Sequence, residues 1–89
     1  MRLQFTRSAV RDLLRLRDCI AQHDPRAAAR IGQRLVRTIR LLGEQPGLGR
    51  AVEELPGVRE VVAGDQVVRY TTQDNSVVVL RVWHGRETR

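Results

Sequence analysis

Apolar residues in the first part of the chain recur with the period of an α-helix. Leu3, Gln4 and Phe5 alternate as a short strand would, and Thr6 follows where a helix N-cap is expected. A helix is predicted from about Arg7 to His23, with its arginines on the side away from the apolar stripe. The stripe consists of Ala9, Leu13, Leu16 and Ile20, widened by Val10 and Leu14.

A second amphipathic helix is predicted from about Pro25 to Leu42. Asp24 followed by Pro25 is typical of an N-cap and the first helical position. Because the connection to the first helix is short, the two helices should form an antiparallel hairpin. The predicted buried stripe is Ala28, Ile31, Leu35, Ile39 and Leu42, and the opposite side carries Arg26, Arg30, Arg34, Arg37 and Arg40.

The second half of the chain has the pattern of a sheet. Residues 43–57 contain several glycines and prolines and predict a loop. Three segments rich in valine and threonine follow, separated by the two-residue turns Gly64-Asp65 and Asp74-Asn75. They predict a three-stranded antiparallel meander made of Val58–Val62, Val67–Thr72 and Ser76–Trp83.

Counting outward from these turns predicts which residues share a face of the sheet. Glu60 lies opposite Arg69 in this register, which predicts an ion pair. Both faces are apolar enough to need cover, yet one helical hairpin can cover only one of them. The first predicted face is Val58, Glu60, Val62, Val67, Arg69, Thr71, Val78, Leu80 and Val82; the second is Arg59, Val61, Val68, Tyr70, Val77, Val79, Arg81 and Trp83. We therefore predict one α+β domain, residues 1–89, with a partner over the remaining face.

The charge of the chain points to a partner of opposite sign. Its formal charge is +6, and all 16 basic residues are arginine. Arginine binds carboxylates and phosphates with two parallel hydrogen bonds, which suits a polyanion or an acidic protein, although a coding bias toward arginine would give the same composition. The sequence contains no apolar run of membrane-spanning length and no signal-peptide pattern, so we expect a cytoplasmic protein.

Few residues suggest chemistry. His23 and His84 are far apart, no cysteine–histidine cluster is present, and no glycine-rich phosphate loop opens a helix, so neither a metal nor a cofactor is predicted. One group combines arginines with aromatic residues and could contact a target or stabilise RNA cleavage. Its members are Arg50, Arg59, Tyr70, Arg81, Trp83, His84 and Arg86. Alternatively, the aromatic rings belong to the core, His84 makes a hydrogen bond at a strand end, and the arginines are solvated.

Short motifs in a particular order resemble the RelE/ParE superfamily of bacterial toxins, and most closely its ParE-like branch. The similarity spans nearly the whole chain. The motifs are Phe5-Thr6, Ala9, Asp12-Leu13, Pro25 with Ala27-Ala28, Pro46 with Gly49-Arg50, Val58–Val62, Val68-Arg69-Tyr70, Val79–Val82 and Trp83-His84-Gly85-Arg86.

This resemblance implies the toxin of a type II toxin-antitoxin module, a class that includes plasmid-stabilisation systems. An acidic, partly disordered antitoxin segment would fold onto the toxin in a hetero-oligomer, and the complex would contact operator DNA only through the antitoxin. Val10, Leu14 and Arg17, with the basic faces of both helices, are the predicted antitoxin contacts. On the second helix these contacts are Arg30, Arg34 and Arg37.

The resemblance leaves the target open. ParE-like members inhibit DNA gyrase by protein contact without being enzymes, and this is the preferred interpretation. The alternative is a RelE-like, ribosome-dependent endoribonuclease, in which Arg59, Arg81 and Arg86 would stabilise the transition state and His84 would act as acid or base. Val61 and Val67 stand where such ribonucleases carry further basic residues, and no tyrosine follows Tyr70. A second alternative is a non-toxic relic that binds only an antitoxin.

Overall fold

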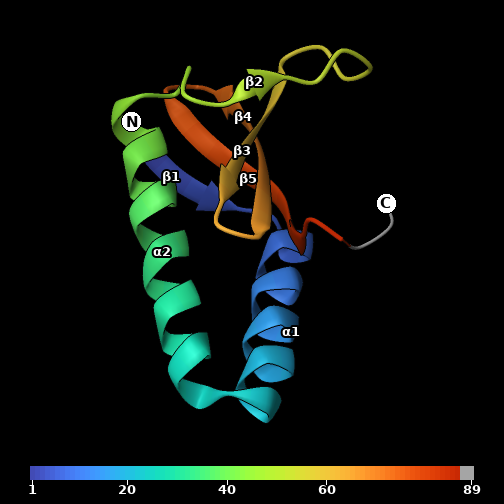
Figure 1. Cartoon of the computed structure of the whole chain (residues 1–89). Coiled ribbons are helices and arrows are strands. Elements are labelled where there is room, and N and C mark those ends of the chain that lie inside the picture. Colours follow the sequence, from blue (N-terminus) through green and yellow to red (C-terminus); the bar gives the residue numbers. More distant parts are fainter. Residues whose placement is uncertain (87–89) are drawn as a thin grey trace.

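A computed structural model describes residues 1–86 and shows an α+β fold, as predicted (Figure 1). A helical hairpin lies against a five-stranded sheet whose strand order is β1-β5-β4-β3-β2. Within residues 1–86 no helix is both long and apolar enough to cross a membrane. The elements are β1 (Arg2–Phe5), α1 (Arg7–His23), α2 (Pro25–Glu44), β2 (Arg50–Ala51), β3 (Val58–Ala63), β4 (Gln66–Gln73) and β5 (Ser76–His84).

Side-chain caps define the hairpin where the sequence predicted them. The Thr6 hydroxyl accepts a hydrogen bond from the Ala9 N–H at 3.0 Å and begins α1. Asp24 is at once the C-cap of α1 and the N-cap of α2, and its carboxylate accepts from the backbone N–H of Arg26 at 3.0 Å. A single residue therefore joins the two helices. Helix α2 continues two residues beyond the predicted end at Leu42.

The sheet contains the predicted meander and two further pairings. Asp74 and Asn75 both have positive φ, 49° and 59°, as a two-residue hairpin turn of type I′ requires. Strand β1 runs parallel to β5 and places the N-terminus beside the last strand. The predicted loop over residues 43–57 contains the short strand β2, which pairs with Arg59 and Glu60 of β3.

A β-bulge corrects the predicted register between β4 and β5. Tyr70 pairs with Val79 but Arg69 pairs with Arg81, so Leu80 is an extra residue in β5. Every β5 side chain after the bulge lies on the opposite face from the one predicted. Val82 consequently joins the face of Val68, whereas Arg81 and Trp83 join the face of Arg69.

The hairpin covers one face of this sheet. Val68, Tyr70, Val77, Val79 and Val82 have no exposed surface, and residues of both helices pack against them. The helical part of this core consists of Ala9, Leu16, Leu35, Ile39 and Leu42. The other face carries Glu60, Val62, Arg69 and Arg81, of which Val62 is 66 % exposed. One face is thus sealed within the chain, and the other remains partly open.

Strand β1 pairs with β5 only as far as Val79, and beyond this point helix α1 lies beside β5. Thr6 is the last residue to continue the strand pairing, with its N–H donating to the Val79 carbonyl at 3.0 Å and its hydroxyl to the Leu80 carbonyl at 2.8 Å. One turn into α1, the carboxylate of Asp12 accepts the Val82 N–H at 2.9 Å. It also accepts the Nε and Nη2 of Arg81 at 2.8 and 3.2 Å. Asp12 therefore satisfies the edge of β5 in place of a strand.

We expect Asp12→Ala to lower the free energy of unfolding by about 3 kcal/mol or more. The Asp12 side chain is only 7 % exposed, so its removal takes a buried hydrogen-bond acceptor from the Val82 N–H. It also removes the carboxylate that pairs with the Arg81 guanidinium. Asp18→Ala is the matched control, because it breaks an exposed pair with Arg17 and should cost less than about 1 kcal/mol. Urea unfolding of both variants measures the difference, and equal losses would contradict a special role for Asp12.

Candidate antitoxin groove and target surface

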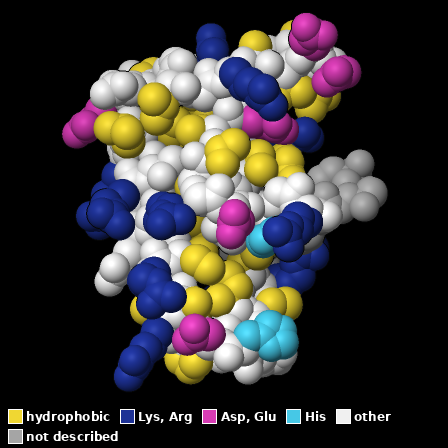
Figure 2. All heavy atoms as spheres, viewed as in Figure 1, with side chains coloured by type: hydrophobic (Ala, Val, Ile, Leu, Met, Phe, Trp, Pro, Cys, Tyr) yellow, Lys and Arg dark blue, Asp and Glu magenta, His cyan; other side chains and the backbone are white. Residues whose placement is uncertain are grey.

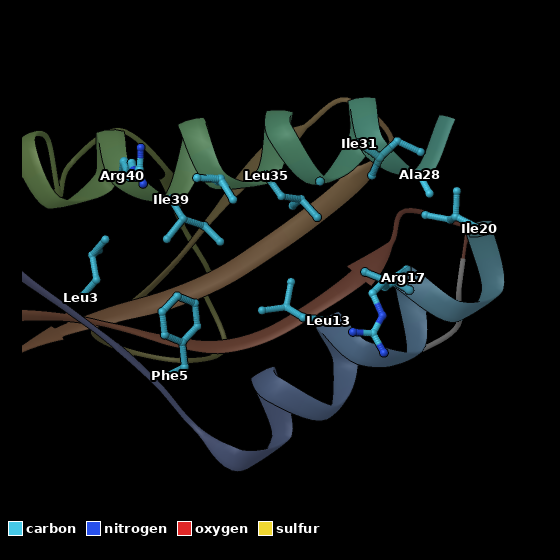
Figure 3. Close-up of a pocket in the computed structure, with 13 residues that line it drawn as sticks. Leu3, Phe5, Leu13, Arg17, Ile20, Ala28, Ile31, Leu35, Ile39 and Arg40 are labelled. Carbon is cyan, nitrogen blue, oxygen red and sulfur yellow. The ribbon is translucent and has the colours of Figure 1, made fainter. Parts of the chain in front are cut away.

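An apolar groove lies between the two helices beside β1. Its cavity volume is approximately 370 Å³. Figure 3 shows side chains of α1, α2 and β1 that point toward one another across it. The lining is Leu3, Phe5, Leu13, Leu16, Arg17, Ile20, Ala28, Ile31, Gly32, Leu35, Val36, Ile39 and Arg40. Only the two arginines in this set are charged, one on each helix.

Exposed apolar side chains extend the groove over its rim. Phe5 and Val36 line the groove yet remain 42 % and 48 % exposed. Val10 and Leu14 on α1 are exposed to a similar degree, and helical geometry places them next to Arg17 on the same side. Three of the residues predicted to bind an antitoxin, Val10, Leu14 and Arg17, thus form a continuous surface with the groove.

The other predicted antitoxin contacts lie elsewhere. Arg30, Arg34 and Arg37 are exposed but do not line the groove. At 100° per residue they point roughly opposite to Leu35 and Ile39, the groove residues of the same helix. An occupant of the groove would leave these three arginines uncovered.

The predicted target-contact group is divided between the two faces of the sheet. Arg59 pairs across β3 and β4 with Tyr70, on the face that the helices cover. Arg81 and Trp83 lie on the opposite face, because of the bulge at Leu80. The expectation that Arg59, Tyr70, Arg81 and Trp83 share one face is therefore wrong.

Tyr70 and Arg59 hold the loop before β2. The Tyr70 hydroxyl donates to the Pro46 carbonyl at 2.7 Å and accepts from the Gly49 N–H at 2.8 Å. The Arg59 guanidinium donates to the Gly49 carbonyl at 2.7 Å. Tyr70 has no exposed surface, so it offers no contact area to a target, contrary to the prediction. Its position below the loop instead fixes where the exposed Arg50 begins β2.

On the open face, a carboxylate and an aromatic ring hold Arg69 between them. The predicted pair with Glu60 forms, with Arg69 Nη2 at 2.6 Å from Glu60 Oε2. The guanidinium carbon of Arg69 lies 5.0 Å from the centre of the Trp83 ring, a cation–π distance. Trp83 is only 7 % exposed and lies outside the main core cluster. The sequence predicted the ion pair but not the stacking, which depends on the bulge.

The remaining candidates lie at the end of β5. Arg81 is held by Asp12, and the His84 Nδ1 accepts the Arg86 N–H at 3.1 Å. Arg50, Arg59 and Arg86 are the members of the predicted group with exposed side chains. Across residues 1–86 no three His, Cys, Asp or Glu side chains are placed to hold a metal ion.

The contact of Asp12 with Arg81 and Val82 at the end of β5 was not predicted from the sequence. Its side chain is on the buried side of α1, close to Ala9 and Leu16 in the helical projection. A carboxylate on a buried helix face needs a cation or backbone donors, and this was the available signal.

Residues 3–89 match the model of the family described as ParE toxin of the type II toxin-antitoxin system, parDE. The chain belongs to this family, within the RelE/ParE superfamily, and is the toxin component of a type II toxin-antitoxin system.

Two curated relatives come from Caulobacter vibrioides. The chain is 41 % identical over 85 residues to Toxin RelE1, covering 91 % of this chain and 89 % of the relative. It is 37 % identical over 82 residues to Toxin RelE2, with 91 % of each chain covered.

Solved structures show the same fold. A chain of the chromosomal ParDE system from P. aeruginosa matches with a TM-score of 0.81 and 26 % identity, covering 94 % of this chain and 95 % of that one. A chain of the RelBE2 toxin-antitoxin complex from Mycobacterium tuberculosis matches with a TM-score of 0.65 and 28 % identity, covering 93 % and 95 %. The relatives therefore carry both ParE and RelE names.

We expect Gly49→Ala to disturb the loop before β2, whereas Gly47→Ala should be tolerated. A Cβ at residue 49 would lie 2.6 Å from the Glu60 carbonyl oxygen and 2.8 Å from the Tyr70 hydroxyl, while one at residue 47 would meet nothing within 4 Å. The first variant should lose about 1 to 3 kcal/mol of stability and the second less than about 0.5. Thermal unfolding of the pair measures this, and equal melting temperatures would show that Gly49 is not closely packed.

Proposed function

We propose that this toxin inhibits DNA gyrase by protein contact and is neutralised by an antitoxin segment that folds into the groove between α1 and α2. DNA gyrase is the proposed target, and the antitoxin segment is the proposed partner. Each is supported by different residues and is tested separately.

The groove suits an amphipathic segment with acidic edges. Its walls are apolar, and the exposed Phe5 and Val36 would lose contact with water when it is filled. Arg17 of α1 and Arg40 of α2 border it and can pair with carboxylates that flank the apolar residues of the partner. Two of the similar structures come from toxin-antitoxin systems, which supports an antitoxin as the occupant.

The observation that carries the choice of target is the ion pair between Asp12 and Arg81. Two hydrogen bonds from the part-exposed Arg81 end on the buried Asp12 carboxylate, so its positive charge is paired within the chain and its guanidinium is held in one orientation. An arginine that stabilises a cleavage transition state must direct its charge at the reacting phosphate. Arg81 lacks that freedom in this conformation.

The other groups needed for RNA cleavage do not converge with Arg81. Arg59 lies on the opposite face of the sheet and donates to the Gly49 carbonyl. The His84 Nδ1 accepts the backbone N–H of Arg86, so this nitrogen already has a hydrogen-bond partner within the chain. This arrangement favours a surface that contacts a protein over one that cleaves RNA.

The ribosome-dependent ribonuclease remains the second candidate, because both curated relatives carry RelE names. Arg86 is exposed at the end of β5 and would be its least constrained cation. A non-toxic protein that only binds an antitoxin is the third possibility.

We expect the purified chain to inhibit DNA supercoiling by gyrase and to leave messenger RNA intact on purified ribosomes. Inhibition should rise with toxin concentration and disappear when the antitoxin encoded beside the gene is added. Heat-denatured toxin at the same concentration is the control for nonspecific binding of a basic protein.

Unchanged supercoiling at saturating toxin, together with message cleavage, would replace gyrase by the ribosome as the target. Absence of both effects, with no growth defect at verified protein levels, would leave only the antitoxin-binding relic.

For the groove, we expect Arg17→Glu combined with Arg40→Glu to weaken antitoxin binding by about tenfold to a hundredfold, because both partners would then be acidic. Arg30→Glu combined with Arg37→Glu is the matched control, since it makes the same charge change at two exposed positions of α2 that do not line the groove. Calorimetric titration with the antitoxin compares the two variants. A greater loss in the control would place the antitoxin on the outer face of α2.

A further inference from the structure

The outer face of α2 is a row of arginines. Arg26, Arg30, Arg34 and Arg37 are all exposed on this 20-residue helix, and the exposed Arg40, which also borders the groove, continues the row at its C-terminal end. They lie within an arc of about 120° and extend along about 21 Å of the helix axis. Figure 2 shows basic side chains gathered in this region, along the left side where Figure 1 places α2. The row is the densest basic surface on the helices.

These arginines have no counter-charge in the described structure. Ion pairs within residues 1–86 involve Arg15, Arg17, Arg69 and Arg81, and none involves an arginine of α2. Like charges spaced three or four residues apart repel one another along a helix. An anionic partner would relieve this repulsion, so the face is prepared for a ligand with several negative charges.

The composition of the face favours nucleic acid over an acidic protein. Protein interfaces depend on buried apolar and aromatic anchors. Between Arg26 and Arg37 the centre of the face carries arginines and Gln33, and its apolar neighbours Ala29 and Val36 lie along the edge toward the groove, where they line a shallow hollow with Arg37. Contacts to a phosphate backbone need no apolar anchor and are dominated by arginine and lysine.

The face also favours a duplex over a single strand. Proteins that bind single strands stack the bases on aromatic rings, and α2 contains no aromatic residue. A straight row of guanidinium groups can instead follow the phosphates of a double helix without reading bases. The expected binding is independent of base sequence and sensitive to salt.

Arg26, Arg30, Arg34 and Arg37 do not line the groove, so these four arginines can act while the groove is occupied. Leu35 and Ile39 of the groove point in nearly the opposite direction from Arg30 and Arg37 on the same helix. We propose that the arginine face of α2 binds the phosphate backbone of double-stranded DNA, so that the toxin itself adds nonspecific DNA contacts to a toxin-antitoxin complex. This departs from the expectation that DNA is contacted only through the antitoxin, and it does not depend on gyrase being the target.

The test measures binding of the full chain to a labelled 30-base-pair duplex of arbitrary sequence by fluorescence anisotropy at several salt concentrations. Arg26→Gln, Arg30→Gln and Arg37→Gln are combined in one variant. Arg34 is kept because its side chain lies against Gly64 in the β3–β4 turn. The matched control combines Arg2→Gln, Arg7→Gln and Arg11→Gln, which removes the same charge from exposed positions outside α2.

The α2 variant should bind roughly 100-fold more weakly at 0.1 M salt and lower the salt slope by about 2 to 3, whereas the control should retain most of its affinity. Circular dichroism establishes that both variants fold. Equal losses in the two variants would overturn the proposal in favour of diffuse attraction by net charge. Tighter binding of poly-glutamate than of the duplex, lost in the same α2 variant, would overturn it in favour of an acidic protein.

Discussion

A sheet edge cannot end abruptly inside a protein without leaving backbone donors unpaired, and the carboxylate of Asp12 resolves this problem for β5. Strand β1 supports only the first half of β5, and α1 must then turn away to form the hairpin. By accepting the Val82 N–H and the guanidinium of Arg81, Asp12 ties the first turns of α1 to the last strand. The position of α1, and hence one wall of the groove, follows from this contact.

The local rules of capping and turn geometry were sufficient to predict most of the fold. Thr6 and Asp24-Pro25 located the helix starts, and the short Gly64-Asp65 turn set the register that brings Glu60 to Arg69. The bulge could not be predicted, because residues 77–80 are all apolar. Their sequence therefore does not indicate which side chains face the core and which face outward. An apolar run on both faces of a strand lacks the alternation that register counting needs.

That one extra residue accounts for most of what was missed in the candidate site. It moves Trp83 beneath Arg69 and separates Arg81 from Arg59, so the arginine group that looked continuous in sequence is divided in space. The contact between Asp12 and Val82 was equally hidden, since it joins residues 70 positions apart and depends on where α1 crosses β5. Helical spacing alone places Val10, Leu14 and Arg17 together, and the structure shows them on the groove side of α1. Spacing within one helix does not say which neighbour forms the groove, so it could not show that Arg30, Arg34 and Arg37 lie outside it.

The link at Asp24 has a consequence for how this toxin and its partner diverge. Because the single residue Asp24 ends α1 and begins α2, the connection is too short to let the distance between the two helices change. A longer loop would let the two walls of the groove move apart or together, whereas the one-residue link at Asp24 holds their spacing. If an antitoxin segment fills this groove as proposed, selectivity among different segments would depend on the size and charge of the side chains that line a slot of fixed width.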